Sequence, residues 1–124
     1  MQKILIVDDD YMIREMCMEV LDSEGYTVFD ANNGRLATEI LEENDDIDLV
    51  ITDIVMPEKD GIQFIGELRR HSSEIKIIAI SGGGKINADQ YLDMAQKLGA
   101  DLILEKPFNI DELLKAIKQI EANE

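Results

Sequence analysis

The chain has 124 residues, with 27 Asp and Glu against 12 Lys and Arg, which gives a net charge of −15. This length fits one domain, a hydrophobic content of 45% is typical of a folded protein, and the charge argues against direct nucleic-acid binding, which needs Lys and Arg to neutralise phosphates. The single Cys17, the lack of a signal peptide and the lack of an apolar run near the roughly 20 residues of a membrane span favour a cytoplasmic protein.

Apolar runs and helical patterns alternate along the first half of the chain. The apolar run at 3–7 ends abruptly at three aspartates, which is typical of a buried strand, and the aspartate at position 10 can cap the helix that follows. Apolar residues then recur at helical spacing, Cys17 among them, until Gly25, a residue type that commonly ends helices. The next predicted elements are a strand at 26–29, a helix after the turn at 32–34 and a strand at 48–53.

The second half continues the same alternation. A third helix carries apolar residues at 62, 65 and 68, and a fourth strand at 75–80 is followed by a glycine run. A fourth helix is expected from Asn87, with Gln90 as its capping partner, to Gly99, and a fifth strand at 102–104 precedes a helix that begins at the capping pair Asn109 and Glu112. Five strands alternating with five helices predict an α/β fold with a parallel sheet.

Polar side chains follow the predicted strands. Right-handed βα connections place the carboxyl ends of all parallel strands at one edge, and a (βα)5 chain favours the strand order 2-1-3-4-5, with a ligand crevice between strands one and three. The residues at these ends are Asp8, Asp9 and Asp10, then Asp53, Ser81 and Lys106. The topology therefore predicts that acids, a hydroxyl and an ammonium group meet at one site.

The charges at this edge predict a cation. Two carboxylates about 4 Å apart repel by about 4 kcal/mol at an effective dielectric constant near 20, and Lys106 alone offsets too little of the charge of Asp8, Asp9 and Asp53. An open site of carboxylates suits Mg²⁺, which keeps waters and recruits phosphate oxygens. A carboxylate beside such an ion, a hydroxyl and a lysine can accept a phosphoryl group, and Asp53 is placed to do so.

Four segments together resemble the receiver domain of bacterial two-component response regulators. They are ILIVDDD at 4–10, VITDIVMPEKDG at 50–61, AISG at 79–82 and LEKPF at 104–108. The resemblance covers essentially the whole chain and implies a flavodoxin-like, doubly wound fold and a signalling role rather than conventional enzyme activity. It implies that a histidine kinase or phosphotransfer protein phosphorylates Asp53, which switches contacts with a downstream protein that the sequence does not identify.

The resemblance also implies a metal site and a phosphoryl site. Asp8, Asp9, Asp53 and the backbone carbonyl of Val55 would hold Mg²⁺. The residues that would bind the phosphoryl group or leave room for it are Ser81, Gly82 and Lys106, and the peptide before Pro107 would be cis, which only an X–Pro bond adopts at low cost.

The chain departs from the family pattern at three places. Ile103 stands where the family usually has Tyr or Phe, so a ring rotation cannot report phosphorylation there. The loop at 82–86 is a few residues longer than usual. Val55 and Gly83 lack the polar side chains that often orient a hydrolytic water, which predicts slow loss of phosphate.

Further expectations concern partners and alternatives. Ile13 and Met16 are candidate docking residues for the helical bundle of a kinase, since Met suits adaptable interfaces. We expect residues 1–124 to form one stand-alone receiver domain without an output domain. Two alternatives are a receiver-like protein that works without phosphorylation and a haloacid-dehalogenase-like phosphatase that uses Asp8 and Asp10 as its D-x-D pair.

Overall fold

A computed structural model describes residues 3–54, 61–72, 74–82, 93 and 96–123. The strands are β1 (Lys3–Val7), β2 (Thr27–Ala31), β3 (Leu49–Asp53), β4 (Lys76–Ser81) and β5 (Leu102–Glu105). The helices are α1 (Tyr11–Ser23), α2 (Gly34–Glu43), α3 (Gly61–His71) and α5 (Ile110–Ala122). Residues 93 and 96–98 are also helical, whereas the expected helix start at Asn87 and its partner Gln90 lie outside the described residues.

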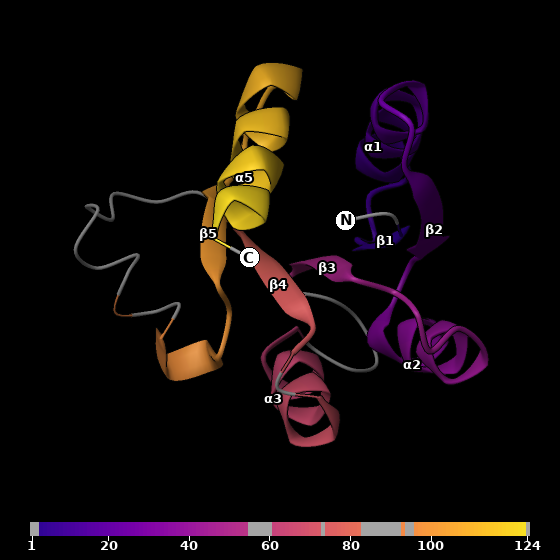
Figure 1. Ribbon diagram of the computed structural model, residues 1–124, viewed down its shortest axis with the longest axis vertical. Helices are drawn as coiled ribbons and strands as arrows, with labels where there is room; N and C mark the ends of the chain where they lie inside the picture. Colours follow the sequence, from indigo (N-terminus) through magenta and orange to yellow (C-terminus); the bar gives the residue numbers. More distant parts are fainter. Residues whose placement is uncertain (1–2, 55–60, 73, 83–92, 94–95, 124) are drawn as a thin grey trace.

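The five strands form one parallel sheet in the order β2-β1-β3-β4-β5 (Figure 1). This confirms the predicted fold class and strand order, with β1 and β3 side by side. Helices α1 and α5 cover one face of the sheet, and α2 and α3 cover the other (Figure 1). The molecule therefore has three layers, and the carboxyl ends of the strands share one edge.

The core is divided between the two faces of the sheet. Ile4 and Ile6 pack with α1 and α5, whereas Leu5 and Val7 pack with α2 and α3. All four side chains are fully buried, which explains why β1 appears in the sequence as a continuous apolar run. Cys17 is also buried, in the layer of α1 and α5, as its position on the apolar stripe predicts.

Side-chain caps begin the helices that flank the site. The Asp10 carboxylate accepts a hydrogen bond of 2.9 Å from the backbone N–H of Met12, at the start of α1. Asn109 and Glu112 form the predicted capping box of α5, each side chain bonded to the backbone of the other. These caps fix where the chain turns from β1 and β5 into the next helix.

A partly exposed ion pair ties α3 to Asp101, the residue before β5. The Arg69 guanidinium donates to the Gly99 carbonyl at 2.7 Å and to the Asp101 carboxylate at 2.8 Å. The same Asp101 oxygen accepts from the backbone N–H of Ile77 in β4. Gly99 has a φ of +86°, a conformation that favours glycine, and it ends the helical residues before it as predicted.

Within the part of the chain that the structure describes, no helix is both long enough and apolar enough to cross a membrane.

Candidate phosphoacceptor site

Two buried aspartates lie at the carboxyl ends of the central strands. Asp53 is the last residue of β3 and is 5% exposed, and Asp8 follows β1 and is fully buried. Because β1 and β3 are paired in parallel, the two carboxylates lie at the same edge of the sheet. The backbone N–H of Asp8 donates to the Ala31 carbonyl at 3.1 Å, which extends the pairing of β1 with β2 beyond Val7.

Lys106 joins the two aspartates. Its Nζ donates to Asp53 Oδ2 at 2.8 Å and lies 3.1 Å from Asp8 Oδ2. Its backbone N–H donates to the Ser81 carbonyl at 2.8 Å, which holds the residue beside the end of β4, and its peptide bond to Pro107 is cis as expected. Burial acts to lower the pKa of Lys106, but the two carboxylates outweigh burial and raise that pKa above its ordinary value.

Three carboxylates gather closely enough to hold one ion. One oxygen from each of Asp8, Asp9 and Asp53 lies within 4.8 Å of the others. Asp8 Oδ2 is buried and accepts no hydrogen bond, since its contact with Lys106 has the distance of an ion pair without hydrogen-bond geometry. Burial is the main cause of a raised pKa for Asp8, to which the charge of Asp53 adds. This set of hard, incompletely satisfied oxygens fits Mg²⁺.

The three consecutive aspartates have different environments. Asp8 is buried, Asp9 is exposed, and Asp10 is exposed with its side chain bonded to the first turn of α1. Asp8 Oδ1 accepts a 2.8 Å hydrogen bond from the backbone N–H of Asp10, which stabilises this turn. Asp10 is therefore a helix cap, as the sequence predicts, and the geometry does not favour a D-x-D nucleophile pair with Asp8.

Ser81 and Gly82 complete the described edge. Ser81 is the last residue of β4 and is 9% exposed, and β4 pairs directly with β3, so its hydroxyl belongs to the same edge as Asp53. A Cβ built on Gly82 would meet no atom within 4 Å, which leaves the open space expected beside Ser81. Val55 and Gly83 lie outside the described residues, as does most of the loop at 82–86.

Gly61 supports the site in a way that its sequence pattern does not reveal. A Cβ at this position would lie 2.1 Å from the Asp53 carbonyl oxygen and 2.5 Å from the Ile54 Cα. The Gly61 backbone N–H also donates to the Ile54 carbonyl at 2.7 Å. The start of α3 therefore packs against the backbone that carries Asp53, and the signal in the sequence was only a glycine at the end of a loop.

Comparisons with known proteins identify the family of this chain. Residues 4–118 match the family model described as the response regulator receiver domain. The chain belongs to this family. Receiver domains are phosphoacceptor signalling domains of two-component systems rather than conventional enzymes, and this role applies to the chain.

Similar proteins come from several bacterial systems. The chain is 38% identical over 120 residues to the transcriptional regulatory protein CpxR of Escherichia coli K12. The aligned region covers 97% of this chain and 49% of that protein. It is 37% identical to the sporulation initiation phosphotransferase F of Bacillus subtilis, covering 95% of this chain and 92% of that protein. The structure of the chemotaxis protein CheY4 of Vibrio cholerae has a TM-score of 0.84 at 30% identity and covers 96% of this chain and 98% of that chain. The chain thus spans about half the length of the CpxR relatives.

A hollow of about 550 Å³ adjoins the receiver site. Ile13 and Met16, the two candidate docking residues, both line it, together with Met12. Its other lining residues are Gly82, Lys106, Pro107 and Phe108. Met12 is 76% exposed, so the start of α1 presents apolar surface directly beside the acidic site.

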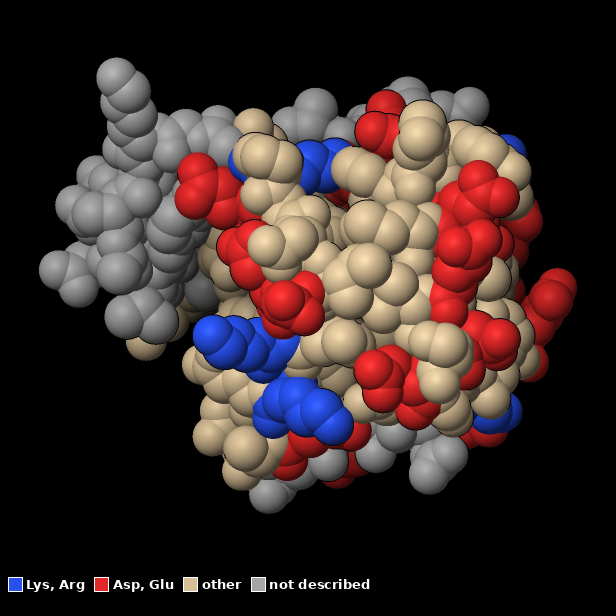
Figure 2. Space-filling model, turned by 90° about the horizontal axis from the view of Figure 1, so that it is seen from above, with Lys and Arg blue, Asp and Glu red and all other residues tan. Residues whose placement is uncertain are grey.

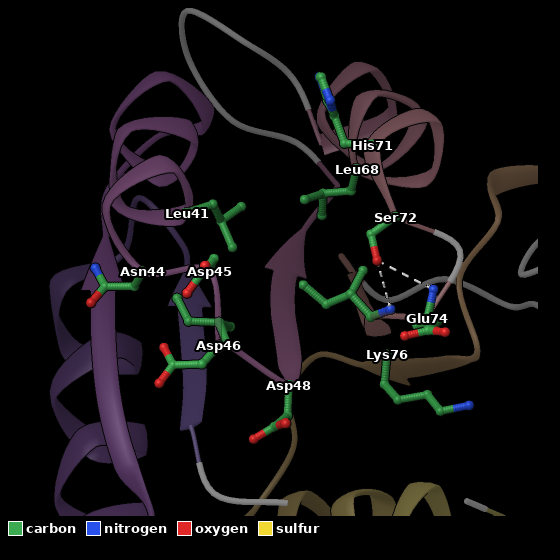
Figure 3. Close-up of a pocket in the computed structure, with 12 residues that line it drawn as sticks. Leu41, Asn44, Asp45, Asp46, Asp48, Leu68, His71, Ser72, Glu74 and Lys76 are labelled. Atoms are coloured by element: carbon green, nitrogen blue, oxygen red, sulfur yellow. Dashed lines mark hydrogen bonds between the residues drawn. The ribbon is translucent and has the colours of Figure 1, made fainter.

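A larger hollow of about 940 Å³ lies away from the carboxyl ends of the strands, where β3 and β4 begin (Figure 3). Leu41 from α2 and Leu68 from α3 line it, and the Ser72 hydroxyl accepts two backbone hydrogen bonds from Glu74 and Ile75 at its rim (Figure 3). None of the predicted site residues lines this hollow, so it is separate from the receiver site.

Proposed function

We propose that this receiver accepts a phosphoryl group on Asp53 from a histidine kinase or phosphotransfer protein and then changes its contacts with other proteins. One observation carries the assignment: the buried Asp53 carboxylate is hydrogen-bonded to Lys106 and lies within 4.8 Å of two further carboxylates. We place the whole of residues 1–124 in one cytoplasmic receiver domain, which the family match over 4–118 supports. Acidic side chains predominate over basic ones on the face seen in Figure 2, which favours protein partners over nucleic acid.

Asp8, Asp9 and Asp53 would hold Mg²⁺, together with the backbone carbonyl of Val55. When bound, this ion supplies positive charge that offsets the charge of the phosphoryl oxygens. The buried Asp8 Oδ2 supports this assignment, because the charge of Lys106 beside it is shared with Asp53 and one ammonium group does not neutralise two buried carboxylates.

The transfer itself requires little from the protein besides position and charge. A carboxylate oxygen of Asp53 forms the new P–O bond while the P–N bond of a donor phosphohistidine breaks, and the electron pair of that bond stays on the imidazole nitrogen. Lys106 and the Ser81 hydroxyl would then bind phosphoryl oxygens at the ends of β5 and β4. Lys106 already contacts the acceptor carboxylate at 2.8 Å.

The hollow beside Ile13 and Met16 is our proposed docking surface for the phosphoryl donor. Replacing Ile13 by Ala should weaken binding of the kinase and slow transfer from it, without affecting phosphorylation by acetyl phosphate. Ile62→Ala is a matched control, because Ile62 is a 54% exposed isoleucine at the start of another helix. Unchanged transfer rate and affinity for Ile13→Ala would contradict the docking assignment.

The departures from the family pattern predict how fast the aspartyl phosphate is lost and which structural change accompanies phosphorylation. Val55 offers no polar side chain to orient water, so we expect the aspartyl phosphate to last many minutes or longer; a half-life of seconds would refute this.

Ile103 is a half-buried residue of β5 that packs toward the layer of α2 and α3, and its side chain has no hydroxyl to exchange partners. We therefore propose that the activated state is signalled by backbone shifts near Ser81 and Lys106.

Intact-mass analysis after incubation with acetyl phosphate tests the proposed function. We expect a phosphate adduct on the wild-type chain that requires Mg²⁺ and is absent from Asp53→Ala. Asp10→Ala is the matched control, since this aspartate caps α1, and it should still be phosphorylated. The absence of an adduct on the wild type would favour a phosphorylation-independent receiver. An adduct on Asp53→Ala would show that another residue is the acceptor. Sustained hydrolysis of a phosphate monoester would favour the phosphatase.

A further inference from the structure

Arg14 connects three elements beside the acidic site. It lies in the first turns of α1, and its side chain is only 14% exposed. Its Nη1 donates to the backbone carbonyl of Asp8 at 2.8 Å, and its Nε donates to the Asp30 carboxylate of β2 at 3.0 Å. Its guanidinium also lies 5.6 Å from the centre of the Tyr11 ring. The guanidinium thus joins α1, the residue after β1 and the edge strand β2.

These contacts determine how the turn between β1 and α1 is held. On one side, Asp8 Oδ1 accepts from the backbone N–H of Asp10, which in turn caps the helix. On the other side, Arg14 holds the Asp8 carbonyl. Because a peptide unit is planar, a fixed Asp8 carbonyl also fixes the orientation of the peptide that leads into Asp9. Asp9 is exposed, so packing contributes little to its position.

We propose that Arg14 is a positioning residue that holds the peptide between Asp8 and Asp9 and thereby keeps the Asp9 carboxylate within reach of the metal. The inference rests on the proposed function, in which Asp8, Asp9 and Asp53 hold Mg²⁺. Arg14 touches neither the ion nor the phosphoryl group in this arrangement, and it acts through the backbone of the turn. Groups that orient metal ligands in this way commonly change metal affinity by a factor of ten or more when removed.

The direction of the change in Mg²⁺ affinity distinguishes a positioning role of Arg14 from an effect of its charge. Arg14 is a cation, so its charge alone repels Mg²⁺, and a neutral replacement would strengthen metal binding if charge were its main contribution. Positioning predicts the opposite, because a loosened turn lets Asp9 leave the site. Lysine keeps the charge but cannot donate from a rigid fork to both Asp8 and Asp30, so Arg14→Lys should recover only part of the affinity.

The test is a Mg²⁺ titration of the full chain, followed by calorimetry and by the amide resonances of residues 8–10 in ¹⁵N spectra. We expect Arg14→Gln to weaken the Kd roughly tenfold, with Arg14→Lys between this variant and the wild type. Arg35→Gln is the matched control: it removes the same charge from α2, where Arg35 pairs with Glu39 at 3.3 Å, and it should leave the Kd unchanged. The Asp9 amide of Arg14→Gln should also shift before any metal is added.

Each other outcome overturns the inference. A tighter Kd for Arg14→Gln would show that charge dominates, and an unchanged Kd with a lower melting temperature would show a structural role alone. If Arg14→Gln fails to fold, Arg14→Lys carries the test, and a wild-type Kd for that variant refutes positioning. If the wild-type chain binds no Mg²⁺, the proposed metal site itself is wrong. If Asp9→Asn weakens Mg²⁺ binding but the Arg14 variants do not, only the role of Arg14 is wrong.

Discussion

Replacing Asp8 by Asn removes one buried negative charge from the receiver site while keeping the size of the side chain. At an effective dielectric constant of 20, the Asp53 carboxylate within 4.8 Å repels it by about 3.5 kcal/mol, and Lys106 at 3.1 Å attracts it by about 5 kcal/mol. Loss of hydration adds a penalty of several kcal/mol for a fully buried ion. With a hydration penalty of about 3.5 kcal/mol, the balance is unfavourable by about 2 kcal/mol, in the direction of the raised pKa of Asp8. We therefore expect Asp8→Asn to stabilise the metal-free protein at pH 7.

Urea unfolding in the presence of EDTA measures this gain, together with a rise in melting temperature of about 8 °C. Asp10→Asn is the matched control, because it removes the same charge from an exposed cap and asparagine caps helices equally well. The raised pKa of Asp8 also fixes the pH dependence. Below the ordinary aspartate pKa of 3.8 the group is protonated in both the folded and the unfolded state, so the gain is absent. The gain grows as the pH rises above 3.8 and is complete above the raised pKa of the folded state.

Magnesium should reverse the ranking. At a hundred times its Kd the ion would stabilise the wild type by about 2.7 kcal/mol, while Asp8→Asn lacks a ligand and gains little. The reasoning is refuted if Asp8→Asn is no more stable than Asp10→Asn in EDTA, or if its advantage is the same at pH 4.5 and pH 8. It is refuted equally if millimolar Mg²⁺ stabilises Asp8→Asn as much as it stabilises Asp10→Asn and the wild type.

Three further predictions concern the supports of the site and the core. Gly61→Ala should lower the free energy of unfolding by about 3 kcal/mol, because its Cβ would overlap backbone. Gly66→Ala should raise it by about 1 kcal/mol, because the new Cβ would make an ordinary contact with Arg70 Nη1 at 4.0 Å; equal effects in urea would contradict this. Arg69→Ala should cost about 2 kcal/mol, because Arg69 donates to the Gly99 and Ile75 carbonyls as well as to Asp101, and a loss below about 0.5 kcal/mol would contradict this. Burial raises the pKa of Cys17 to about 12, so a thiol reagent at pH 8 should label it only as the protein unfolds, and labelling of the folded protein within minutes would refute this.

The convergence of the site residues was predictable because it follows from topology. Parallel strands with right-handed connections bring the ends of β1, β3, β4 and β5 to one edge, whatever the side chains are. The aspartates at 8, 9 and 53 and the lysine at 106 stand directly at those ends, so their meeting needs no knowledge of packing. The cap role of Asp10 was predictable for a similar reason, since it depends on residues within one helical turn.

The supporting residues were not predictable, because their roles depend on distances through space. Arg14 appears in the sequence as one polar residue of a helix, and its partner Asp30 lies 16 positions away in β2. Gly61 matters because the start of α3 touches the backbone after β3, which the sequence between them does not encode in any local pattern. Which Asp8 oxygen lacks a hydrogen bond likewise depends on the position of Lys106 to within an ångström.

Arg14 and Lys106 use their charges differently, and this difference bears on the divalent ion that we propose for the site. Lys106 contacts carboxylates of the site and cancels one of their three negative charges. Arg14 is paired with Asp30 and reaches the site only through a backbone carbonyl, so its charge does not reduce the deficit of two that remains. A doubly charged cation matches that deficit, and an arriving phosphoryl group then restores negative charge that the cation and Lys106 can share. Asp30 therefore contributes to the site from a distance: without it, the charge of Arg14 would act on the metal site unopposed.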